Sequence, residues 1–276
     1  KINSIILLSG MLQNYYFFVG LYKTRIDMGC WNDIVSGTRY SFKALGDLFF
    51  PRKCAVCQTI LACEERNICD DCRNDIPYTW FWSWPENPAE ERMWSKVGIE
   101  SAASLFFYRY TGGYGHILHK FKYRCNIPLG LETGRDLGKK MANGERCGDI
   151  DAIVPVPLHW RRRWSRSFNQ ADIISRGVAE GFSSQPEGKS IPVIRSLVKR
   201  TKMTSTQTRL SGNEKAENVK NAFRVNKKVA LRLLSKGINH ILLVDDVLTS
   251  GSTLAACATP LMLYFRVSVA TIGFVE

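Results

Sequence analysis

The residues best suited to chemistry lie in the stretch 241–253, "ILLVDDVLTSGST". Its first four residues are continuously apolar, which is typical of a buried parallel strand. Two adjacent acids follow where the strand is expected to emerge, Asp245 and Asp246. After them come the small polar residues Thr249, Ser250, Gly251, Ser252 and Thr253. Hydroxyls, backbone N–H groups and the start of a helix favour a phosphate dianion, and glycine permits close backbone approach or a positive φ.

The two acids extend this prediction from a phosphate to a sugar phosphate. A phosphate cradle alone does not need two carboxylates, whereas the vicinal hydroxyls of a sugar can donate hydrogen bonds to them. A nearby Mg²⁺ would offset the negative charge. Ligands of open α/β sheets bind at the carboxyl ends of strands. The stretch therefore predicts a site for a 5-phosphorylated ribose; the alternative is a strand followed by an ordinary polar turn.

A second chemical signal is the cysteine pattern of residues 54–72, "CAVCQTILACEERNICDDC". It contains two C-x-x-C pairs separated by eleven residues, formed by Cys54, Cys57, Cys69 and Cys72. Four thiolates are a preferred ligand set of structural Zn²⁺, and such a site leaves no position for a reacting water. A metal would stabilise a module too small to fold on apolar burial alone. The alternatives are unliganded cysteines or disulfides, and Cys63 is interpreted as a bystander.

A third signal is a group of arginines after a short apolar strand at residues 153–156. Pro155 and Pro157 cannot donate to a sheet ladder, so this strand should leave the sheet there. The arginines that follow are Arg161, Arg162, Arg163 and Arg166. Guanidinium groups offer paired donors, which suit a pyrophosphate or a nucleic-acid backbone. The alternative is a solvated basic face of a helix.

These groups require a framework of strands and helices to position them. The patterns predict a strand within 101–110, helices over 127–142 and 168–182, and a further helix over 254–263. Residues 195–224 are polar and rich in Ser and Thr, which predicts a long functional loop. The aromatic group at residues 80–84 has two interpretations: stacking of nucleic-acid bases, or packing of the metal module onto its neighbour.

Composition narrows the class of protein and its partners. The 276 residues carry a net charge of +13, and residues 151–276 hold 19 Lys and Arg against 9 Asp and Glu. This favours polyanionic partners, with ordinary solubility charge as the alternative. Nine cysteines, mostly clustered, predict a cytoplasmic protein rather than a secreted one. The apolar start of the chain is too interrupted to predict membrane association, and residues 1–27 are interpreted as an upstream extension before Met28.

The motifs together resemble a known family. Residues 241–253 resemble the phosphoribosyl pyrophosphate (PRPP) motif of type I phosphoribosyltransferases. The cysteine pairs, "FKYR", "VPVPLHWRRRWSRSFNQ", "TQTRL…ENVKNAF" and the PRPP-like motif occur in the order that is typical of the ComF family of competence-associated proteins. The resemblance covers about residues 45–276. It implies an α/β fold with a phosphoribosyltransferase-like parallel sheet flanked by helices, over 95–276. It also implies a four-cysteine zinc module at 45–85, preceded by an extension at 1–44.

The same resemblance implies roles for individual residues. The two acids at 245–246 would hold ribose hydroxyls, the loop 249–253 the 5-phosphate, and the loop 157–166 pyrophosphate, while 203–218 would be a flexible lid. Three positions depart from the family pattern. Ser250 stands where a threonine is common, which is a mild change. Ser167 stands where a glycine is usual, and Lys215 stands where an arginine is usual, which keeps the charge but loses the paired donors.

Two functions follow as hypotheses. The first is a ComF-like protein that binds PRPP with Mg²⁺, or a related ribose phosphate, and also single-stranded DNA. It would work with the DNA-uptake machinery in natural transformation. The alternative is an active phosphoribosyltransferase of nucleotide metabolism that releases pyrophosphate from PRPP. A PRPP sensor without catalysis shares the same site. No general base or acceptor pocket can be named from the sequence.

Overall fold

The computed structural model describes residues 52–62, 64–108, 113–115, 117, 126–144, 146–158, 168–186, 188–201 and 222–276. Contacts within the chain separate residues 1–52 from residues 53–276, and everything below concerns the second unit. The predicted N-terminal extension, Cys63, the arginines of 161–166, Ser167 and the predicted lid with Lys215 lie outside the described residues. No helix in the described part of the chain is both long and apolar enough to cross a lipid bilayer.

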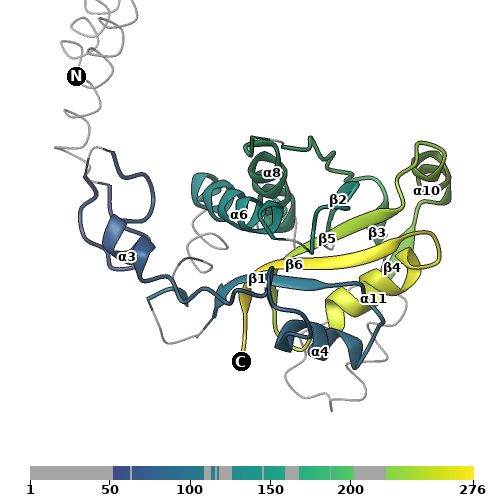
Figure 1. Cartoon of the computed structure of the whole chain (residues 1–276), viewed down its shortest axis with the longest axis horizontal. Helices are drawn as coiled ribbons and strands as arrows, with labels where there is room; N and C mark the ends of the chain where they lie inside the picture. The colour runs from purple at the N-terminus through teal and green to yellow at the C-terminus, as the bar shows by residue number, and fades with distance from the viewer. Residues whose placement is uncertain are drawn as a thin grey trace, which may run out of the picture. The chain divides into compact units, whose positions relative to one another are not determined.

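A four-stranded parallel sheet forms the centre of this unit (Figure 1). Its strands are β1 (Ala102–Phe107), β2 (Ala152–Pro155), β5 (His240–Leu248) and β6 (Arg266–Phe274). They lie in the order β1-β6-β5-β2, and all three pairings are parallel. The α/β class predicted from the sequence is therefore confirmed. The two central strands are apolar at successive positions because helices cover both faces of the sheet.

One face of the sheet is covered by α6 (Ile127–Ala142) and α8 (Gln170–Ser183), and the other by α4 (Pro88–Trp94) and α11 (Ser252–Leu261), as Figure 1 shows. Strand β5 contributes side chains to the hydrophobic core on both faces of the sheet. Leu242 and Val244 pack in the core cluster that contains α6 and α8, whereas Ile241 and Leu243 pack in the cluster that contains α11. This is the alternation expected of a strand buried on both sides.

Smaller elements complete the unit. A short helix, α3 (Asp70–Asn74), contains Cys72, and α10 (Lys227–Leu234) precedes β5. Strands β3 (Val198–Arg200) and β4 (Phe223–Val225) form a separate antiparallel pair. The prediction of one long loop over 195–224 was therefore wrong at both ends, because those ends pair with each other. Residues 202–221 between them are not described.

Two predicted boundaries also change. Strand β5 does not end at Val244 but continues to Leu248, so both acids lie inside the strand, and Asp245 is in register with Thr271 of β6. The strand continues because β6 offers backbone partners as far as Phe274. The helix predicted from residue 168 begins at Gln170, and the helix predicted over 254–263 begins at Ser252 and ends at Leu261. The helix over 127–142 and the strand within 101–110 are confirmed.

Helices α6 and α8 approach each other closely through glycines. Gly134 and Gly138 of α6 face Gly177 and Gly181 of α8, and a Cβ added at any of the four would overlap backbone atoms of the opposite helix. At Gly138 the overlap would be with the carbonyl group of Val178. This contact requires glycine because the backbones themselves touch.

We expect Gly138→Ala to lower the free energy of unfolding by about 1–3 kcal/mol, because the added methyl group must push the helices apart. The measurement is denaturant unfolding of the full chain. Gly98→Ala is the control, since an added Cβ there meets nothing within 4 Å. Equal stability of the two variants would show that the helices are not in backbone contact.

Candidate functional site

The two acids lie half-buried near the carboxyl end of β5. The backbone N–H of Asp246 donates to Oδ1 of Asp245 at 2.9 Å, which orients the first carboxylate. Side chains of β5 alternate between the two faces of the sheet, and this alternation shifts by one residue across the two acids. Val244 and Val247 contact the same core cluster although they are three residues apart. The pair thus lies where the regular alternation of β5 is interrupted.

Asp245 acts electrostatically on a buried thiol of α11. Burial raises the pKa of Cys257 far above its usual value, and the negative charge of Asp245 raises this pKa further, whereas Arg200 lowers it. Cys257 is completely buried beneath the sheet. Asp245 and Arg200 are thus the charged groups that act on the Cys257 thiol.

The loop 249–253 has the backbone geometry that the sequence predicted. Gly251 adopts a left-handed conformation, with φ of 74°, and it occupies the N-cap position of α11. No side chain caps this helix, so hydroxyls and backbone N–H groups surround its first turn. Ser250 Oγ and Ser252 Oγ are 3.1 Å apart, and Thr249 and Ser250 are exposed. This arrangement can donate several hydrogen bonds to one anion.

Helix α4 holds this loop in place through Arg92, a residue that the sequence did not single out. Its Nη1 donates to the carbonyl oxygen of Thr249 at 3.0 Å and to that of Val275. The guanidinium carbon lies 4.1 Å from the centre of the Phe274 ring. Arg92 thereby joins the loop to the end of β6.

The described residues on either side of the arginine segment meet at the same edge of the sheet. The N–H of Val156 donates to the carbonyl oxygen of Val244 at 2.9 Å, and Asn169 Nδ2 donates to the carbonyl oxygen of Val156 at 3.1 Å. Val156 therefore lies beside β5, and Asn169 lies beside Val156. Arg161, Arg162, Arg163 and Arg166, between these two positions in the sequence, lie outside the described residues. The roles predicted for these arginines stay predictions.

The four cysteines of the two C-x-x-C pairs come together in the structure. The Sγ atoms of Cys54, Cys57, Cys69 and Cys72 all lie within 4.8 Å of one another, and none is in a disulfide. This cluster could hold a metal ion, and its chemistry fits Zn²⁺, for which thiolates are common ligands. Hydrogen bonds with Thr59 lower the pKa of Cys57 to about 6, whereas burial raises the pKa of Cys72.

The cysteine module, residues 53–76, is fastened to the rest of the unit by polar contacts with α6 and its surroundings. Arg73 pairs with Glu132 of α6, and Asn67 Nδ2 donates to the same carboxylate at 2.6 Å. Tyr114 donates to the carbonyl oxygen of Cys72 at 2.9 Å. Apolar residues of the module also belong to the core cluster of α6 and α8.

The aromatic group at 80–84 divides into two pairs. Trp82 is buried in the core cluster that also contains Cys54 and Cys69, which agrees with the packing interpretation. Phe81 is buried in the other cluster, against Phe107 and Phe274. Trp80 and Trp84 keep 61% and 49% of their surface exposed. The packing interpretation therefore does not account for the two exposed indoles.

Comparisons with known proteins agree with this architecture. The chain is 28% identical to "Competence protein F" of Haemophilus influenzae over 221 residues, which are 75% of this chain and 89% of that protein. It is 32% identical to "DNA utilization protein YhgH" of Escherichia coli K12 over 149 residues, and to the protein of the same name in Salmonella typhi over 156 residues. These alignments cover 53% and 55% of this chain, and 60% and 63% of the relatives. No family model matches the chain. The similarities, the cysteine cluster and the parallel sheet support the resemblance to the ComF family that the sequence motifs indicate.

Proposed function

We propose that this protein binds a 5-phosphorylated ribose, PRPP with Mg²⁺, and single-stranded DNA, and that it acts in DNA uptake during natural transformation. One observation carries the ligand proposal. An acid pair at the carboxyl end of a central strand is followed directly by a left-handed glycine and an uncapped helix start. This is the place where open α/β sheets bind ligands.

The groups around this edge match the parts of the proposed ligand. The carboxylates of Asp245 and Asp246 would accept hydrogen bonds from the ribose hydroxyls, and the N–H groups and hydroxyls of 249–253 would donate to the 5-phosphate. The arginines of 161–166 would pair with pyrophosphate or with DNA phosphates. Mg²⁺ would balance the charge between the acids and the pyrophosphate.

The DNA proposal has separate support. One relative carries the name competence protein F and others the name DNA utilization protein. The excess of ten positive charges in residues 151–276 would attract a polyanion and make binding depend on salt. With zinc bound, the cysteine module would be a rigid folded unit beside the sheet.

Calorimetry of PRPP with Mg²⁺ tests the ligand proposal. We expect Asp245→Asn to weaken binding by about tenfold or more, because each lost charge-assisted hydrogen bond is worth roughly 1.5–3 kcal/mol. Glu100→Gln is the control, because Glu100 precedes β1 at the opposite edge of the sheet. Absence of binding to the zinc-loaded wild type would refute the proposal.

The glycine of the loop allows a second test with a closely matched control. We expect Gly251→Ala to weaken PRPP binding about tenfold, because a left-handed alanine costs roughly 1–2 kcal/mol and its Cβ would press against Met93 Sδ at 3.0 Å. Gly237→Ala carries the same backbone cost, with φ of 79°, but meets nothing within 4 Å. PRPP affinity should be unchanged in that control, and equal losses in both variants would contradict the role of the loop.

The alternative function is an active phosphoribosyltransferase that uses the same site. A turnover assay distinguishes it from a protein that only binds PRPP. Pyrophosphate release from PRPP in the presence of a base or amine, abolished by Asp245→Asn, would establish it. Binding of PRPP without release of pyrophosphate across a broad panel of acceptors would favour an effector role.

The affinity for single-stranded DNA, measured by fluorescence anisotropy between about 50 and 200 mM salt, should fall by orders of magnitude over that range.

A further inference from the structure

The aromatic loop, residues 80–87, presents two tryptophans to solvent on a fixed backbone. Trp80 has a positive φ of 61° and Glu86 one of 53°, a conformation that bulky residues rarely adopt. The carbonyl oxygen of Trp80 accepts from the N–H groups of Ser83 and Trp84, which closes a tight turn. Unusual backbone conformations of this kind collect at functional sites, where the surrounding structure enforces them.

Buried polar groups enforce this conformation. The side chain of Asn87, fully buried, donates to the carbonyl oxygens of Trp84 at 2.9 Å and Ala102 at 3.0 Å, and more distantly to that of Phe81. Arg146 Nη1 donates to the carbonyl oxygen of Trp84 at 2.9 Å. The backbone that carries the two exposed indoles is thus held in position before any partner arrives, so binding would not have to order this backbone.

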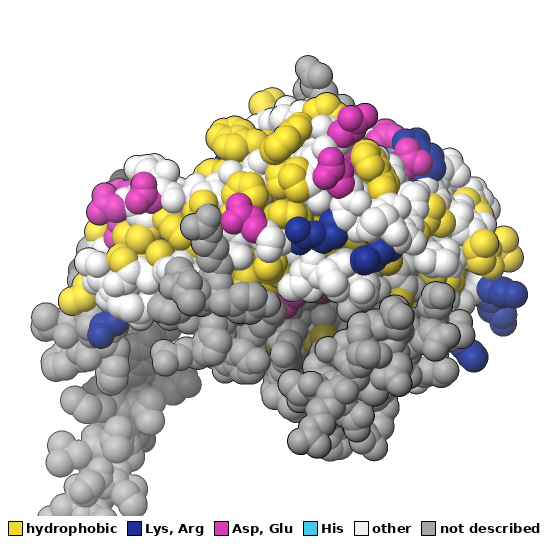
Figure 2. Space-filling model, turned by 90° about the horizontal axis from the view of Figure 1, so that it is seen from below, with side chains coloured by type: hydrophobic (Ala, Val, Ile, Leu, Met, Phe, Trp, Pro, Cys, Tyr) yellow, Lys and Arg dark blue, Asp and Glu magenta, His cyan; other side chains and the backbone are white. Residues whose placement is uncertain are grey.

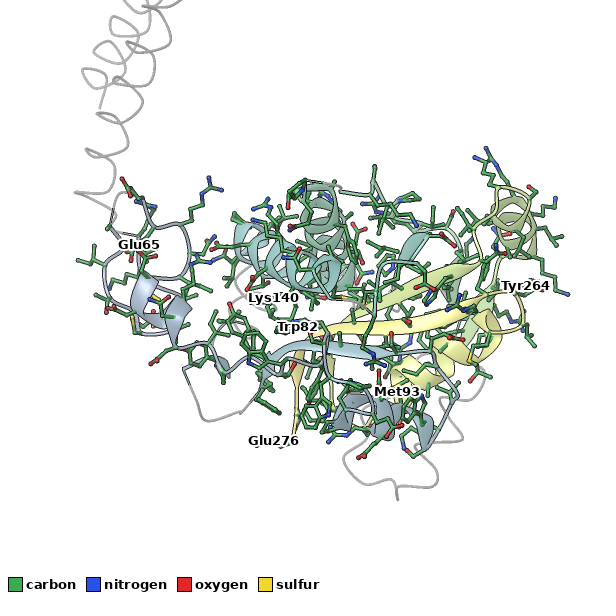
Figure 3. The ribbon with its side chains drawn as sticks, in the orientation of Figure 1. Glu65, Trp82, Met93, Lys140, Tyr264 and Glu276 are labelled. Atoms are coloured by element: carbon green, nitrogen blue, oxygen red, sulfur yellow. The ribbon has the colours of Figure 1, made fainter. Side chains whose placement is uncertain are left out.

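Positive charge lies against the same aromatic rings. Lys140, in the last turn of α6, places its Nζ 3.9 Å from the ring centre of Tyr78, 5.2 Å from that of Trp82 and 5.6 Å from that of Trp80. Figure 3 shows Lys140 and Trp82 together at this end of α6. Lys139 beside it is exposed. Aromatic faces next to cations are the combination that binds unpaired bases and their phosphates.

The aromatic loop also lies at the edge of the sheet that carries the candidate phosphate loop. The ring of Phe81 is 5.2 Å from that of Phe274 and 5.7 Å from that of Phe107, the last residues of β6 and β1. Phe274 is in register with Leu248, which directly precedes the loop 249–253. Figure 2, viewed from the side where α4 lies in Figure 1, shows hydrophobic side chains among basic and acidic ones on this face.

We infer that Trp80 and Trp84 form a stacking platform for unpaired bases of single-stranded DNA, with Lys140 supplying charge to its phosphates. This deepens the proposed DNA function and rests on it. The commitment to a single strand follows from the chemistry: indole faces reach bases only when these are not paired, and cations beside them attract the backbone.

The test is the affinity of the zinc-loaded full chain for a fluorescent oligothymidylate and for an abasic strand of the same length. We expect the double variant Trp80→Ala/Trp84→Ala to bind oligothymidylate about tenfold or more weakly, because stacking on each indole is worth a factor of roughly five or more. Wild type should lose a similar factor on the abasic strand, whereas the double variant should bind both strands alike. Trp80→Phe should keep most of the affinity.

Controls separate stacking from misfolding and from charge. Trp94→Ala removes another exposed indole, 41% exposed, on α4, and should leave DNA affinity unchanged. Lys140→Ala should weaken binding and reduce its salt dependence, whereas the tryptophan variants should keep the salt dependence of wild type. Unchanged melting temperatures of the variants would show that the fold is intact.

The results of these binding measurements test the stacking platform separately from the proposed DNA function. Wild-type binding that the tryptophan variants retain in full would overturn the platform and leave the proposed DNA function standing. Equal affinity of wild type for double-stranded and single-stranded DNA would also overturn it. No binding of wild type to a single strand at low salt would remove both.

Discussion

Replacing Cys54 by serine is expected to abolish tight zinc binding and to unfold the cysteine module. Cys54 is completely buried, and its Sγ accepts from the N–H groups of Val56 and Cys69 at 3.4 Å. A hydroxyl in its place is a poor ligand, so three thiolates would remain. The free energy of metal binding in such small modules is also folding free energy, about 10–16 kcal/mol in zinc-finger peptides.

The measurement is the metal content of purified protein together with its melting curve, with and without a chelator. Wild type should hold one zinc ion per chain and lose stability when the chelator is added. Cys63→Ser is the control, since the spacing of the two cysteine pairs predicts that this residue is not a ligand. A Cys54→Ser protein with a full equivalent of zinc would refute the four-thiolate site, as would wild type that melts identically after chelation.

Local patterns in the sequence were sufficient for the parts of the structure that local chemistry determines. The two C-x-x-C pairs predicted the cysteine cluster because metal ligands have a characteristic spacing. The apolar runs predicted β5 and the amphipathic patterns predicted α6 and α8. Gly251 was predicted to need conformational freedom, and it is left-handed. The positions of the arginines at 161–166 stay a prediction.

Other elements had signals that were missed. Asn87, Pro88 and Glu90 form a capping box with proline at the first helical position, a pattern typical of a helix start, and α4 begins there. Residues 266–274 alternate enough to indicate a strand, which is β6. The glycines of α6 and α8 recur at intervals of four, although a sequence alone does not say which two helices they bring together.

Long-range partners could not be predicted because they depend on the completed fold. Arg92 binds the carbonyl oxygen of Thr249, 157 residues away in the sequence. His240 is buried and shares a hydrogen bond with Ser268 at 2.8 Å, while its Nδ1 lies 3.0 Å from Asp149. No local pattern around His240 indicates these partners.

The charged side chains at the two edges of the sheet have different surroundings. At the amino edge, ion pairs satisfy the charged groups: Arg266 with Asp149 and Glu100, and Lys189 with Asp151. Asp151 also accepts from the N–H groups of Asn239 and His240 at 3.0 Å. This edge serves stability. The carboxyl edge carries the acid pair and the hydroxyl-rich loop, where we propose that the ligand binds.

Glu90→Ala is expected to lower the free energy of unfolding by about 3–5 kcal/mol, the usual cost of leaving a buried charge without its partner. The Glu90 carboxylate is fully buried. It accepts from Arg146 at 2.8 Å, from the N–H of Ala102 at 3.1 Å and from the N–H of Asn87 at 3.3 Å. Alanine would leave the two N–H groups without this acceptor, and Arg146 would have to move toward solvent.

Denaturant unfolding of the full chain measures this loss, and Glu91→Ala is a matched control. Glu91 is the next residue on the same helix and is exposed, so its replacement should change the free energy of unfolding by less than about 0.5 kcal/mol. Because Glu90 and Arg146 also hold the backbone at Trp84, the Glu90 variant should lose affinity for oligothymidylate under conditions where it is still folded. Equal stability of the two variants would contradict the buried network and, with it, the rigid presentation of the two exposed tryptophans.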